Sequence, residues 1–163
     1  MTNMTDTTTL PATARVWIYQ ANRPFREADV PQIKKYVDEF AQGWASHNRQ
    51  LRAHGDVLHR QFVVLMVDEG QADASGCSID TSVRFMQQLG QAYGVDLFDR
   101  MTFTWLENGE VKSAHSEEFR QLYAAGKITD DTLVFDNVVK TKGELDEKWT
   151  KPLNESWHRR FVN

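Results

Sequence analysis

The chain of 163 residues is 40% hydrophobic and 26% charged, with a formal net charge of −4 and a pI near 5.7. This composition is typical of a soluble globular protein, and it excludes the basic face that nucleic acid or an anionic membrane surface would require. The longest apolar run, 62–67, is too short to cross a bilayer, no signal-peptide pattern is present, and the single cysteine forms no internal disulfide, so we expect a cytoplasmic protein.

The N-terminal segment 1–14 is rich in threonine and poor in apolar side chains, which predicts a disordered leader. A single α+β domain is expected over 15–163. Its first strand is predicted at 15–20, where β-branched and aromatic residues crowd together.

A helix should follow this strand, with Asp29 as its N-cap and Pro31 just inside its first turn. Apolar side chains at helical spacing carry it to near His47. The segment 51–59 is then predicted as a modest strand that is interrupted or bulged at Gly55.

The segment 62–67 is apolar on both faces and predicts a central strand. A polar loop leads from it to an amphipathic helix over 79–93, with Ser78 as the expected N-cap. Alternating residues at 101–105 predict the next strand. The order β-α-β-β-α-β in this core, 15–106, favours a ferredoxin-like sandwich.

A C-terminal extension, 107–163, should add a small α/β lobe and a helical tail. Ser116 is the expected cap of a short helix, and the segment 132–135 is predicted to form a further strand. The tail carries an apolar stripe, which two short helices separated at Pro152 would place on one side. The stripe consists of Leu145, Trp149, Leu153, Trp157 and Phe161.

Three stretches resemble an uncharacterised family of small soluble bacterial proteins. They are RVWIYQAN at 15–22, LMVDEGQADASGCSIDTSVRF at 65–85 with DLFDRM at 96–101, and 140–161, which contains KTKGEL and SWHRRF. Members of that family often carry the label "ABC transporter ATPase". A P-loop requires G-x-x-x-x-G-K-[ST], and here Cys77 stands in the place of the lysine. The chain therefore has no Walker motif.

A second, local resemblance concerns 108–135, with the pattern NGE…EEFRQLYAAGKITDDTLVF. It is similar to GYF-type adaptor modules, which bind peptides. The tryptophan and the glycine-tyrosine-phenylalanine residues that form the groove of those modules are not evident in this chain. The resemblance implies the local fold of such a module.

The loop before the predicted helix over 79–93 is the first place to expect a site. The residues there that could bind or react are Asp68, Glu69, Ser75, Gly76, Cys77 and Ser78. A thiol at a helix start has a lowered pKa and is more reactive, yet a free cysteine is more often a small packing residue, which is the interpretation we favour. The acids, with Asp73 and Asp80, would suit Mg²⁺ or Ca²⁺, but a solvated acidic loop is the default.

Trp149 and Trp157 are candidates for recognition, because tryptophan anchors dominate interface energies. They would equally serve to cover the chain's own core. Our leading hypothesis is a non-catalytic binding or interaction protein without cofactor or metal, able to self-associate through a sheet edge or the aromatic tail. The alternative is a small enzyme at the junction 68–80, with the Cys77 thiol or an acidic metal site. An ATPase, as the family label implies, ranks last.

Overall fold

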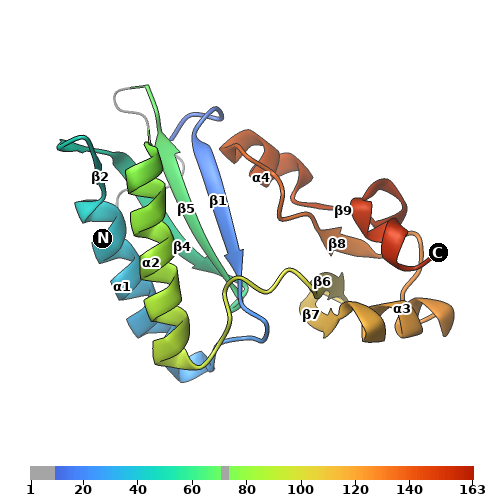
Figure 1. Ribbon diagram of the computed structural model, residues 1–163. Helices are drawn as coiled ribbons and strands as arrows, with labels where there is room; N and C mark the ends of the chain where they lie inside the picture. The colour runs from blue at the N-terminus through green and yellow to red at the C-terminus, as the bar shows by residue number, and fades with distance from the viewer. Residues whose placement is uncertain (1–9, 71–73) are drawn as a thin grey trace.

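The computed structural model describes residues 10–70 and 74–163. Helices and antiparallel strands alternate along the chain, so the α+β class is confirmed (Figure 1). In chain order the elements are β1 (Arg15–Gln20), η2 (Glu27–Asp29), α1 (Val30–Gly43), β2 (Ala45–Ser46), β3 (Arg49–Gln50), β4 (Arg52–Leu58), β5 (Phe62–Asp68), α2 (Gly76–Tyr93), β6 (Thr102–Glu107), β7 (Glu110–His115), α3 (Ser116–Ala124), β8 (Leu133–Phe135), α4 (Lys142–Lys148), β9 (Thr150–Pro152), η3 (Leu153–Glu155) and η4 (Trp157–Phe161). None of the described helices has the length and apolar character needed to cross a membrane.

The first sheet has the strand order β1-β5-β4 and is antiparallel throughout. Its central strand is β5, whose residues from Phe62 to Val67 are all buried, so the prediction of an interior strand at 62–67 is confirmed. Helices α1 and α2 cover one face of this sheet (Figure 1). Successive side chains of β5 point to opposite faces, which is why a strand buried on both sides must be apolar at every position.

Gly55 lies in the middle of β4 and pairs with Leu65 in an uninterrupted ladder, so the predicted bulge is wrong. A Cβ atom at this position would lie 2.5 Å from Cγ1 of Val37 on α1. Glycine is present because the helix backbone and β4 approach closely here. We expect Gly55→Ala to lower the free energy of unfolding by about 1–3 kcal/mol, as overpacked core positions do. Urea unfolding would measure it.

Gly43 provides the matched control, because a Cβ atom there would meet no other atom within 4 Å. Gly43→Ala should leave stability unchanged or raise it by up to about 1 kcal/mol through helix propensity. Equal effects of the two substitutions would contradict the close packing of α1 on β4.

The two long helices begin and end differently from the sequence prediction. Helix α1 ends at Gly43 rather than near His47, and Asp29 makes no side-chain capping bond. Helix α2 is capped by Ser75, not Ser78: the Ser75 hydroxyl accepts from the Ser78 amide, and the Ser78 hydroxyl accepts from the Ser75 amide. This reciprocal pair is a capping box in which serine replaces the usual glutamate, so the helix starts three residues earlier than expected.

The second sheet has the order β7-β6-β8-β9. A ferredoxin-like sheet would require β6 to pair with β1, but β6 pairs with β7 and with β8. The ferredoxin-like topology is therefore not confirmed. Instead, the chain after β8 lies alongside the free edge of β1. The Val16 amide donates there to the Lys140 carbonyl at 2.9 Å.

The second sheet and α4 cover the face of the first sheet that α1 and α2 leave open (Figure 1). Phe62 meets Phe135 and Trp149 there, with ring centroids 5.1 and 4.8 Å away. Leu10 and Ala14 are buried in the same cluster, so ordered structure begins before Arg15. The rest of the predicted leader, 1–9, lies outside the described residues.

One buried amide joins the two sheets. The Gln20 Nε2 of β1 donates to the Thr102 carbonyl at 2.7 Å, and its Oε1 accepts from Thr104 Oγ1 at 2.9 Å and from Asn137 Nδ2 at 2.8 Å. Trp149 Nε1 completes the chain of bonds by donating to Asn137 Oδ1 at 2.9 Å. Because an unpaired buried polar group is costly, this network fixes how the sheets are placed relative to each other.

The tail differs from the two predicted helices. Helix α4 is present, but Pro152 ends strand β9, which pairs with β8 at the sheet edge and is followed by two short 3-10 helices. A proline is tolerated in an edge strand, where its missing N–H need not join the ladder. The apolar residues that recur every four positions in the tail thus lie on several short elements and not on two helices.

Candidate functional site

The acids at the junction after β5 are engaged by neighbouring parts of the chain. Asp68 accepts from Arg52 Nη1 at 2.6 Å and from the Gly70 amide at 3.0 Å. Glu69 accepts from the Ala74 amide at 2.8 Å. Both carboxylates therefore have partners within the chain, and no group of potential metal ligands occurs among residues 10–70 and 74–163. Asp73 lies outside the described residues.

Cys77 is the second residue of α2 and is exposed, so the interpretation that it packs in the core is wrong. Its carbonyl accepts from Thr81 Oγ1 at 2.9 Å. Gly76 beside it is exposed as well, whereas Ser75 and Ser78 are engaged in the capping box. Because the thiol is exposed at a helix start, the hypothesis of a small enzyme with Cys77 as its nucleophile stays a prediction.

Iodoacetamide labelling of Cys77 against pH tests that prediction. If the thiol is a nucleophile, we expect its labelling rate to reach half of its maximum at least about one pH unit below the value of about 8.5 for a free thiol. A midpoint at or above that of a free-cysteine peptide would end the nucleophile hypothesis.

The tail tryptophans serve the chain's own core. Trp149 is 8% exposed and packs on Phe62 and Phe135. Trp157 is half-buried against the hydrophobic cluster around Phe103, and its Nε1 donates to Asp136 Oδ1 at 3.0 Å. Both indole N–H groups thus have partners within the chain, and both rings pack on aromatic neighbours of the core.

A buried polar cluster near the C-terminus was missed in the sequence. The ring of His158 is 1% exposed and its Nδ1 lies 2.6 Å from Ser156 Oγ. Burial lowers the pKa of His158 to about 4; Asp136 acts against this and Lys151 acts with it. Burial alone would raise the pKa of Asp136, but hydrogen bonds from Lys151, Trp157 and the Val138 amide hold it below its usual value. Because His158 is enclosed by aromatic rings, this cluster is structural.

A cleft of about 630 Å³ lies where the turn between β4 and β5 approaches the turn between β6 and β7. Its deepest residue, Gln61, is fully buried. The Ala21 amide donates to the Gln61 carbonyl at 2.8 Å, and Gln61 Nε2 donates to the Ala21 carbonyl at 3.0 Å. Gln61 therefore braces the end of β1 against the turn before β5.

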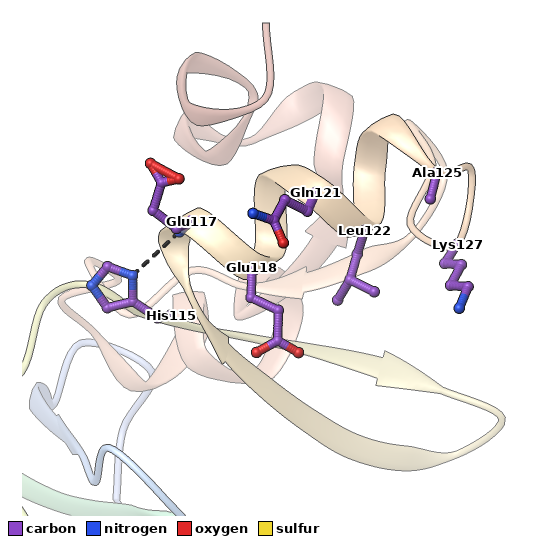
Figure 2. A pocket seen from close by; sticks show the side chains of 7 residues that line it. All are labelled: His115, Glu117, Glu118, Gln121, Leu122, Ala125 and Lys127. Atoms are coloured by element: carbon purple, nitrogen blue, oxygen red, sulfur yellow. Dashed lines mark hydrogen bonds between the residues drawn. The ribbon is translucent and has the colours of Figure 1, made fainter.

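A second concavity is an open groove of about 670 Å³ along α3 (Figure 2). Its lining combines apolar, acidic and basic side chains from one side of the helix and the residues that flank it. They are His115, Glu117, Glu118, Gln121, Leu122, Ala125 and Lys127. We call this surface the α3 groove. Its helix positions recur every three to four residues, but they mix polar and apolar side chains and so form no apolar stripe that marks a face in the sequence.

His115 sets the start of α3, in place of the expected Ser116. Its Nδ1 accepts from the Glu117 amide at 3.2 Å, so the ring is held at one end of the α3 groove (Figure 2). Glu118, Leu122 and Lys127 project toward the side of α3 where the β6–β7 hairpin lies, whereas Glu117 points away from it (Figure 2). Glu117 is paired with Arg120 at 2.8 Å.

The α3 groove combines charged and aliphatic surface. A carboxylate lies toward its first end on α3, an aliphatic surface lies in the middle, and the ammonium of Lys127 lies just after the helix, which packs through Phe119 into the core. Comparisons of this chain with protein-family models, with curated proteins and with solved structures find no match.

Proposed function

We propose that this protein is a non-catalytic interaction protein and that it binds a peptide segment of its partner in the α3 groove. The observation that carries the proposal is the open groove itself, with apolar Leu122 and Ala125 between the charged side chains of Glu118 and Lys127. Apolar contact area flanked by a few placed charges is how proteins bind short segments selectively.

The resemblance of 108–135 to GYF-type modules supports the same surface. The segment contains the turn after β6, then β7, α3 and β8, and the α3 groove lies along the helix of that unit. Side chains typical of the groove of those modules are replaced here, so a partner peptide of different chemistry is expected.

Selection of displayed peptides on the immobilised full chain tests the proposal. Peptides enriched on the natural sequence should bind at least about tenfold more weakly to Ala125→Arg, which places a long charged side chain in the groove. The matched control is Glu39→Arg, at an exposed position of α1 on the other sheet, which should bind as the natural chain does. Peptides whose affinity is the same for all three proteins, or the absence of any enriched peptide, would refute the proposal.

A further inference from the structure

Strand β7 is an outer strand of the second sheet. Its partner β6 is joined to it by the two-residue turn Asn108–Gly109, whose residues have φ of 53° and 81°, and the first pair is Glu107 with Glu110. In such a hairpin the closing pair is hydrogen-bonded and the pairs alternate from there. The backbone groups of Val111 and Ser113 therefore point away from β6.

No described residue donates to or accepts from the backbone of Val111 or Ser113. Both residues are half-buried, and the strand between them is straight, without a bulge that would turn this edge away. Free N–H and C=O groups in a row along an edge are a template for another strand. The free edge of β7 thus offers main-chain hydrogen bonds.

Helix α3 begins where β7 ends and runs back along the hairpin toward its turn (Figure 2). Glu118 and Leu122 project from α3, and Lys127 projects from the segment after it, toward the side where that hairpin lies. Going from Glu118 to Leu122 covers about 6 Å at 1.5 Å per helical residue, which matches about two residues of a strand at 3.3 Å each, and Lys127 follows after the turn that ends α3 at Gly126. Alternate side chains of an added strand would therefore reach the three positions in turn.

We propose that the partner peptide binds as an extended strand added to the free edge of β7, and that it carries a basic, an apolar and an acidic residue at three successive alternate positions. This inference rests on the proposed function and deepens it. The basic side chain pairs with Glu118, the apolar one lies on Leu122, and the acidic one pairs with Lys127, while Val111 and Ser113 supply the main-chain bonds. Glu118 and Lys127 are exposed and have no ion pair with another described residue, so both charges are free for a partner.

The test uses the full chain and a capped threonine peptide with lysine, leucine and glutamate at three successive alternate positions. Binding is measured by fluorescence anisotropy of the labelled peptide and by the amide NMR signals of Val111 and Ser113. Binding should shift both signals. A second peptide, N-methylated on alternate amides along one edge, should bind about tenfold more weakly or worse, because it cannot donate to β7.

Ser113→Pro gives the complementary variant. The Ser113 N–H lies outside the β6–β7 ladder, so proline at this edge position leaves the ladder intact, which the thermal midpoint checks. It should weaken binding about tenfold, whereas Ser113→Ala, which keeps the N–H, should not. Glu118→Lys should weaken binding of the first peptide and strengthen binding of a peptide with lysine and glutamate exchanged.

Each other outcome is decisive. If displayed peptides depend on Ala125 but ignore Ser113→Pro and N-methylation, the added strand is wrong and the proposed function stands. If strand addition holds but the charge exchange has no effect, the assigned charge pattern is wrong. If the chain alone sediments as a dimer that Ser113→Pro dissociates, the free edge of β7 binds a second copy and the peptide partner is overturned. If no peptide binds, both proposals fail.

Discussion

Replacing Phe62 by alanine is expected to lower the free energy of unfolding by about 3–5 kcal/mol, the range for large aromatic side chains removed from a core. Phe62 is fully buried in β5 and contacts the rings of Phe135 and Trp149, so the substitution leaves a cavity between the two sheets. Such a loss is a large part of the 5–15 kcal/mol that folded domains typically have. Urea unfolding followed by tryptophan fluorescence would measure it.

Tyr36→Ala is the control for this prediction. Tyr36 lies on α1 and is 42% exposed, so its truncation should change stability by roughly 1 kcal/mol or less. If Phe62→Ala had a comparably small effect, the packing of the second sheet against β5 would be refuted.

Acid should destabilise the protein well before its carboxylates titrate. In the folded state the pKa of His158 is lowered to about 4, against an ordinary value of 6.5, because its ring is buried. Between these values the unfolded chain binds a proton that the folded chain does not, so the free energy of unfolding falls as the pH drops from about 6.5 to about 4. At 1.36 kcal/mol per pKa unit the loss is about 3 kcal/mol. Urea unfolding at several pH values would measure it.

His158→Asn separates this effect from a general loss of packing. The variant should be less stable at neutral pH, but the slope of its stability between pH 6.5 and 4 should be much shallower. Burial lowers the pKa of His59 as well, so His59→Asn should remove a smaller part of the slope in the same direction. Asp136 acts below this window, because its lowered pKa gives stability that is lost only at stronger acidity. An unchanged slope in His158→Asn would contradict the assignment.

Local features of the fold were predictable where one physical signal dominated. The run 62–67 could only be an interior strand, because it is apolar on both faces, and the asparagine-glycine pair at 108–109 specifies a two-residue hairpin turn. Gly94 ends α2 with φ of 68°, as a helix-terminating glycine should. These signals are contained within a few residues each.

Pairing between distant strands was not predictable in the same way. The alternating pattern of a strand such as β6 predicts which side chains face inward, but it does not predict which strand lies next to it. The side chains of Gln20 and Thr104 gain their mutual hydrogen bond only where the two sheets meet, so the local sequence does not reveal it. Likewise, Pro152 on its own predicts a break between helices, because its tolerance in an edge strand depends on a partner, β8, that the local sequence does not reveal.

The candidate site shows the same limit. The sequence directed attention to Cys77 and the neighbouring acids, which are chemically conspicuous. The α3 groove is instead made of ordinary residues such as Gln121 and Ala125, and its meaning comes from the strand that runs beside it. No single residue type marks such a surface.

The cover over Phe62, Val64 and Met66 has a consequence for synthesis of the chain. These three side chains of β5 are shielded by Phe135, Leu145 and Trp149, which leave the ribosome long after β5 itself. During that interval the nascent chain carries a bare hydrophobic strand, the kind of surface that associates wrongly with other chains. The strand needs protection from other chains until residue 149 has emerged, so chains that end after β5 but before residue 149 should aggregate.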